Sequence, residues 1–158
     1  MGRKLDISPV NEIKSLSNML NRKLNDVLAA AGGENLNSFQ LWIICYIDYC
    51  QALGQQVFQK DIEQYFDIRR PTASKLLDML EEQGFLDRET DDEDRRRKKL
   101  ILTEKSKAYL AGRSQYLDEF GRQFLYGISH RQLASFMKTL GEMKQNLERI
   151  KSSKAKVR

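Results

Sequence analysis

The sequence has few of the residues on which enzyme and metal sites depend, with one histidine, two cysteines and two prolines among 158 residues. His130 alone cannot complete the usual catalytic arrangements, and the sequence contains no metal-ligand grouping or phosphate-binding loop. We therefore expect a protein that is not an enzyme and has no metal or other cofactor. Because Pro9 and Pro71 are the only prolines, long helices are permitted almost everywhere, which disfavours an all-β fold.

The two cysteines are too few for a disulfide framework. Cys45 and Cys50 lie five residues apart on one predicted helix, which puts them about 140° apart around its axis. They cannot readily bridge each other in that geometry. We expect buried thiols rather than a redox sensor.

Long hydrophobic runs are also missing. No segment approaches the roughly 18 apolar residues that a membrane span requires, and residues 1–6 lack the apolar centre of a signal peptide. We expect a cytoplasmic protein that makes no membrane contact.

The composition is 41% hydrophobic and 31% charged, with a formal net charge of +5. Such a chain of 158 residues suits one helical globular domain or a compact dimer subunit. The positive charge favours a polyanionic partner without saying which one.

Apolar residues recur at three- and four-residue steps through most of the chain, which predicts helices. The region between residues 85 and 102 instead resembles two short strands around a highly charged turn. The predicted order is a helix over 7–30, a buried helix around 39–47, helices over 59–66 and 70–83, strands over 85–88 and 98–102, and helices over 103–126 and 130–150.

Local signals support the ends of these helices. Asn37 with Gln40 and Ser129 with Gln132 have the spacing of reciprocal capping boxes, and Thr103 can cap the helix that follows the second strand. The helices are therefore expected to begin at these residues.

A short helix, a tight turn and a second helix, followed at once by a charged hairpin, form the layout of a winged helix-turn-helix. In the second helix the apolar side chains share one side, which leaves an outer face that includes Asp78. Residues in the first turns of such a helix usually contact base edges in the major groove. The predicted DNA-binding residues of this recognition helix are Arg69, Arg70, Thr72, Ser74 and Lys75.

The turn of the hairpin is the sharpest signal. An arginine at a projecting hairpin tip can enter the narrow minor groove, and a neighbouring carboxylate can hold its guanidinium in a fixed fork. We assign these two roles to Arg96 and Asp94. The predicted DNA-binding residues of the hairpin are Asp94, Arg95, Arg96, Arg97 and Lys98.

At these residues the chain resembles the MarR family of bacterial transcription regulators. The hairpin of that family typically reads D-x-x-D-x-R, a few residues, then an apolar residue, any residue and L-T. The matching residues here are Asp91, Asp94, Arg96, Leu100, Leu102 and Thr103. Residues 70–86 also look like the family's recognition helix and its exit. The resemblance implies a triangular homodimer whose two winged parts lie on successive major grooves.

Three positions depart from the family pattern. Phe58 replaces the usual Thr or Ser cap before the first short helix, Asp67 replaces the turn glycine, and Arg69 replaces a serine before the recognition helix. Asp tolerates the left-handed backbone region better than most residues, so the turn remains feasible. The missing caps leave helix-end N–H groups without an assigned acceptor.

We expect a mainly α fold, a winged helix-turn-helix with N- and C-terminal helices forming a dimerisation domain. The domains would be a dimerisation helix over 1–34, a DNA-binding domain over 35–103, further dimerisation helices over 104–150 and a basic tail over 151–158. The apolar stripes of the terminal helices also favour a homodimer, since one small winged module cannot cover them.

The resemblance implies that the chain regulates transcription. The predicted function is therefore sequence-specific binding of double-stranded DNA as a transcriptional regulator, an effector-responsive repressor on a near-palindromic operator. An architectural or RNA-binding winged protein, and an adaptor built on the terminal helices, remain alternatives. The resemblance also allows a small-molecule effector, and the candidate pocket residues are Trp42, Tyr46 and Tyr49.

Overall fold

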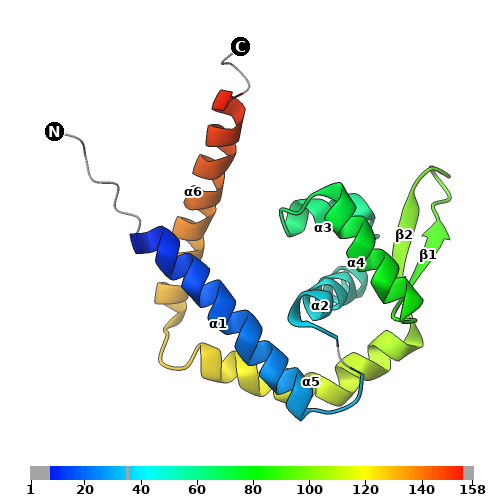
Figure 1. The fold of residues 1–158 in the computed structure, drawn as a ribbon, viewed down its shortest axis with the longest axis horizontal. Coiled ribbons are helices and arrows are strands. Elements are labelled where there is room, and N and C mark those ends of the chain that lie inside the picture. Colours follow the sequence, from blue (N-terminus) through cyan, green and yellow to red (C-terminus); the bar gives the residue numbers. More distant parts are fainter. Residues whose placement is uncertain (1–7, 35, 155–158) are drawn as a thin grey trace. The chain divides into compact units, whose positions relative to one another are not determined.

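Figure 1 shows the fold in a computed structural model, which describes residues 8–34 and 36–154. The chain divides into two compact units, Met1–Phe120 and Gly121–Arg158. The elements are α1 (Ser8–Ala30), α2 (Ser38–Ala52), α3 (Gln59–Tyr65), α4 (Arg70–Glu82), β1 (Leu86–Thr90), β2 (Lys98–Leu102), α5 (Glu104–Phe124) and α6 (His130–Lys154). The predicted mainly helical, winged helix-turn-helix fold is confirmed.

Helix α2 is the centre of the first unit. It begins at a capping box in which the Asn37 side chain accepts from the N–H of Gln40, 2.9 Å, and the Gln40 side chain accepts from the N–H of Asn37, 3.0 Å. The helix packs against α1 and β2, and its fully buried side chains are Leu41, Ile43, Ile44 and Ile47. The nearly continuous apolar sequence of this helix therefore predicted its burial correctly.

Helices α3 and α4 form the helix-turn-helix. The turn between them passes through Asp67, whose φ of 48° is in the left-handed region, so aspartate does take the conformation that favours glycine. Along α4, Ala73, Leu77 and Leu80 are buried against the core, as predicted. The helix ends before Gly84, which also has a positive φ, 74°.

The wing is the antiparallel hairpin of β1 and β2 with the connecting residues 91–97 (Figure 1). Its register pairs Leu86 with Leu102 and Thr90 with Lys98. The first strand was predicted to end at residue 88, which is wrong, because the ladder extends through the polar residues to Thr90. Residues 57 and 58 add a short extension beside β2, where the N–H of Leu100 donates to the carbonyl of Val57, 2.8 Å.

Helix α5 begins at the predicted cap, since the Thr103 hydroxyl accepts from the N–H of Ser106, 3.3 Å. One turn and two turns further along, Tyr109 and Arg113 are buried. The Arg113 guanidinium lies 3.7 Å from the centre of the Tyr109 ring and donates to the carbonyl of Gly32 in the loop between α1 and α2. These contacts join α5 to that loop within the first unit.

The second unit contains the end of α5 and helix α6. The predicted capping box is present, because Ser129 and Gln132 exchange hydrogen bonds between side chain and backbone. Residues 151–154, predicted as part of a loose basic tail, continue α6, and residues 155–158 lie outside the described residues. Across the two described stretches, no helix is long and apolar enough to span a membrane.

We predict that Asn37→Ala lowers the free energy of unfolding by about 1 kcal/mol, because the first turn of α2 loses its side-chain acceptor. Urea denaturation at fixed protein concentration measures this change. Asn37→Asp keeps the acceptor and is the matched control. Equal stability of the alanine and aspartate variants would contradict the role of the cap.

Candidate nucleic-acid interface

The start of α4 presents most of the predicted recognition residues. Arg69, Arg70, Thr72 and Lys75 are exposed, whereas Ser74 is half-buried and its hydroxyl donates to Asp78, 3.4 Å. The N-cap residue Arg69 has no side-chain cap hydrogen bond. Pro71, the second residue of α4, has no N–H, and the Arg69 side chain caps none of the other N–H groups in the first turn.

Arg88 of β1 ties the wing to α4. Its guanidinium lies 2.6 Å from an oxygen of Asp78 and 3.3 Å from an oxygen of Glu81. Asp78 thus faces the hairpin rather than belonging to a freely exposed outer face, which corrects the sequence-based expectation. The reason is tertiary, since only the folded hairpin brings a cation to this side of α4.

The turn of the wing is organised around the carboxylate of Asp91, which is only 2% exposed. Its oxygens lie 3.9 Å from Nε of Arg97 and 3.8 Å from Nζ of Lys99, and one oxygen accepts from the N–H of Glu93, 3.4 Å. The backbone closes around it, because the N–H of Asp91 donates to the carbonyl of Arg97, 3.1 Å. The exposed Asp92 carboxylate also binds Lys99, 3.1 Å, and raises the pKa of that ammonium group.

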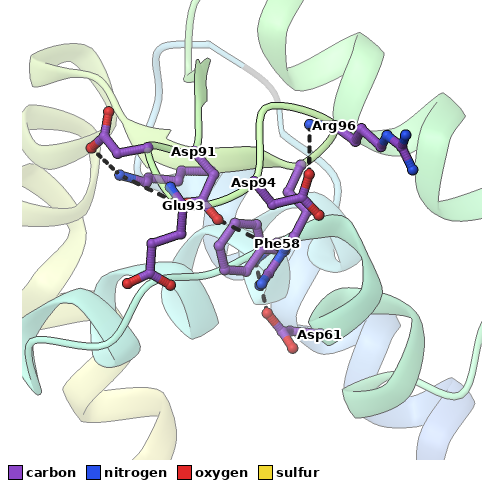
Figure 2. A network of polar contacts seen from close by, with 9 residues as sticks. Phe58, Asp61, Asp91, Glu93, Asp94 and Arg96 are labelled. Carbon is purple, nitrogen blue, oxygen red and sulfur yellow. Dashed lines mark hydrogen bonds and ion pairs between the residues drawn. The ribbon is translucent and has the colours of Figure 1, made fainter.

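The predicted fork between the Asp94 carboxylate and the Arg96 guanidinium is wrong. Figure 2 shows that the Asp94 carboxylate accepts from the backbone N–H of Arg96, 3.0 Å, while the guanidinium extends away from it. A short aspartate side chain reaches the N–H two residues ahead more readily than a long neighbouring side chain. Asp94 therefore orders the backbone of the turn rather than the arginine head group.

Sequence reasoning missed two residues at the start of α3. The Phe58 ring lies under the guanidinium of Arg97, with 3.7 Å between the guanidinium carbon and the ring centre. The carboxylate of Asp61 accepts from the N–H of Phe58, 2.8 Å, which is the half of a capping box that does not depend on the side chain of the cap residue (Figure 2). The aspartate at the third position of the helix was the available signal.

The wing, α3 and the start of α4 enclose a hollow of about 780 Å³. Its lining is rich in cations drawn from all three elements. These cations are Lys60, Arg70, Arg88, Arg96, Arg97 and Lys98. Asp61 and Glu63 also line the hollow, but Asp61 binds the N–H of Phe58 and Glu63 accepts from Gln59, 3.0 Å.

Comparisons with known proteins agree with this geometry. A sequence model of the MarR family matches residues 45–97, the segment from α2 to the wing tip. The transcription regulator MarR from Oenococcus oeni is 26% identical, with a TM-score of 0.73 over 85% of this chain and 97% of that one. Over residues 45–97 the chain is similar to the MarR family, and its fold resembles that of the Oenococcus oeni regulator.

Two further solved structures share the fold. One is MepR of S. aureus in a complex with DNA, at 21% identity and a TM-score of 0.76, covering 91% of this chain and 99% of that one. The other is PcaV of Streptomyces coelicolor in complex with its natural ligand, at 17% identity and a TM-score of 0.64, covering 92% and 98%. The MarR-family fold thus extends well beyond the segment that the sequence model matches.

The predicted effector residues lie apart from the cationic hollow. Trp42 is half-buried against the core, and Tyr46 stacks on Tyr65 with ring centres 4.1 Å apart. Tyr49 is 65% exposed. None of the three lines the hollow or a smaller cavity of about 240 Å³ between the α1–α2 loop and Lys105, and their pocket role stays a prediction.

Both cysteines are free, with Cys50 buried and Cys45 half-buried. Burial, followed by the nearby Asp48 carboxylate, raises the pKa of the Cys45 thiol to about 11. The thiolate of Cys45 is therefore scarce at neutral pH. His130 is exposed at the start of α6, and among the described residues no three His, Cys, Asp or Glu side chains gather to hold a metal ion.

We predict that Asp91→Ala lowers the free energy of unfolding by about 1–3 kcal/mol, because Arg97 and Lys99 lose a buried charged acceptor. Asp92→Ala removes an exposed carboxylate of the same turn and should have little effect. Chemical denaturation of both variants makes the comparison. If the two substitutions cost the same, burial of Asp91 does not organise the wing.

Proposed function

We propose that this MarR-family protein is a sequence-specific regulator that binds double-stranded DNA as a homodimer and acts as an effector-responsive repressor. In this proposal α4 enters the major groove and the wing tip reaches the neighbouring minor groove. The protein acts by occupying an operator rather than by catalysis.

The cationic hollow is the observation that carries this proposal. It has the lining that a phosphate strand requires, with Arg70 of α4 and Lys98 of β2 both facing it. Phosphate contacts of this kind supply most of the affinity and make it fall steeply with salt. A strand seated there would leave α4 and the wing tip free to contact the two grooves on either side.

Apolar faces on the terminal helices support a homodimer. On α1, Val10, Ile13 and Met19 are exposed within one chain. On α6, Phe136 is 48% and Leu147 is 61% exposed. Apolar stripes of this extent are typical of an interface, and two-fold pairing would call for half-sites roughly 34 Å apart.

Effector control is supported by relatives of the same fold. PcaV has been solved with its natural ligand and MepR with DNA. A ligand that favours one separation of the two winged modules would shift the population toward states that fit or misfit the half-sites.

Selection of bound fragments from a random duplex library tests the function as a whole. A regulator should enrich one near-palindromic site and bind it at least about 1,000-fold more tightly than random DNA at physiological salt. Equal affinity for selected duplex, random duplex and RNA would instead identify the architectural or RNA-binding alternative.

We predict that Arg96→Ala weakens binding to the selected duplex about 5- to 30-fold, through loss of the minor-groove contact. Fluorescence anisotropy at fixed salt measures the affinity. Lys107→Ala, which removes an exposed cation of α5 outside the hollow, is the matched control. Unchanged affinity of the Arg96 variant would contradict the proposed wing contact.

Leu147→Asp should abolish dimerisation and specific DNA binding together, because it places a charge on the apolar face of α6. Sedimentation velocity and anisotropy follow the two properties. Gln145→Asp adds the same charge at an exposed position about 160° around the helix from Leu147 and should leave both intact. Specific binding by a monomeric Leu147 variant would refute the link between pairing and DNA binding.

A further inference from the structure

Arg97 differs from the other arginines of the wing tip in what its side chain contacts. Its guanidinium stacks on the Phe58 ring, 3.7 Å from the ring centre, and its Nε lies 3.9 Å from the buried Asp91 carboxylate. Arg95 and Arg96 are exposed, and within the described residues their side chains form no ion pair or stacking contact. One of three consecutive arginines is thus held against the protein, while two extend outward.

The ring that receives Arg97 is itself held at the junction between the helix-turn-helix and the wing. The N–H of Phe58 donates to Asp61 of α3, 2.8 Å, and its backbone forms a β-bridge with Lys99 of β2. The carbonyl of the preceding Val57 accepts from Leu100. The backbone that carries the Phe58 ring is therefore hydrogen-bonded to both α3 and β2.

We propose that Phe58 and Arg97 are positioning residues, a cation–π clasp that fixes the wing against the helix-turn-helix so that Arg96, not Arg97, enters the DNA groove. This inference rests on the proposed function. In the complex Arg97 stays on the ring and makes no phosphate contact.

The clasp has a chemical requirement that separates it from ordinary packing. A guanidinium on an aromatic face is attracted by the ring quadrupole and stacks flat, which a leucine of similar bulk cannot reproduce. Phe58→Leu therefore keeps most of the apolar volume while removing the attraction. Phe58→Tyr keeps the aromatic face and should behave like the unmodified chain.

Hydrogen exchange of the DNA-free protein tests whether the clasp orders the wing. In Phe58→Leu the amides of Asp91 and Arg97, which both donate within the turn, should exchange at least about threefold faster, and Phe58→Tyr should restore them. Phe66→Leu is the matched control, since this ring at the other end of α3 contacts Phe39 and Tyr65. Unchanged exchange in Phe58→Leu, or equal acceleration in Phe66→Leu, would overturn the clasp.

Binding to the selected duplex tests the consequence for DNA. Phe58→Leu and Arg97→Ala should each weaken binding about threefold to tenfold, and the double variant should bind no more weakly than either single variant. Neither should lower the slope of log affinity against log salt, whereas Arg96→Ala should lower it by about 1. If Arg97→Ala lowers the slope and Phe58→Leu binds normally, Arg97 contacts DNA directly and the proposal is wrong.

The two measurements separate the clasp from the function on which it rests. If the unmodified chain binds no duplex, DNA regulation fails, while exchange of the free protein still decides whether Phe58 and Arg97 order the wing. If the unmodified chain binds its duplex and the exchange rates of Phe58→Leu do not change, only the clasp fails.

Discussion

Burial of one carboxylate governs the shape of the wing. Asp91 is buried at the start of the hairpin turn, where its carboxylate lies near the cationic groups of Arg97 and Lys99. Its backbone N–H donates to the carbonyl of Arg97 across the turn. A buried charge without partners is very unfavourable, so the surrounding cations are required as much as they are attracted. This constraint fixes the base of the turn, and residues 92–97, which follow the buried Asp91, are exposed.

Side chains connect the wing to the helix-turn-helix at two places. Arg88 joins β1 to the middle of α4, and Arg97 rests on Phe58 at the start of α3. Under the proposed function, a module with such cross-links would present α4 and the wing tip at a set spacing before DNA arrives. Preorganisation of this kind would lower the ordering cost of binding, and part of the positive charge of the wing would serve the protein rather than the nucleic acid.

Much of the fold could be predicted from local patterns. Asn37 with Gln40 and Ser129 with Gln132 are signals that act over three residues, and the structure contains both boxes. The strand limit at residue 88 was wrong because Glu89 and Thr90 have no apolar alternation, yet they pair with Lys99 and Lys98 in the ladder, where the Lys98 ammonium also donates to the Thr90 hydroxyl, 2.6 Å. The Asp94–Arg96 fork was wrong for a related reason, since sequence adjacency does not say whether a carboxylate meets a side chain or a backbone N–H.

The sequence by itself determined the order of the elements, the resemblance to the MarR family and the stretch of chain that forms the candidate site, because helical periodicity, caps and the wing motif are encoded by neighbouring residues. Only the tertiary structure decided which charges stay with the protein and which remain available. Asp78 pairs with Arg88 ten residues away, and Arg97 stacks on a ring thirty-nine positions earlier in the chain. Such pairs depend on how the hairpin folds back over α3 and α4, and no pattern of adjacent residues specifies that geometry.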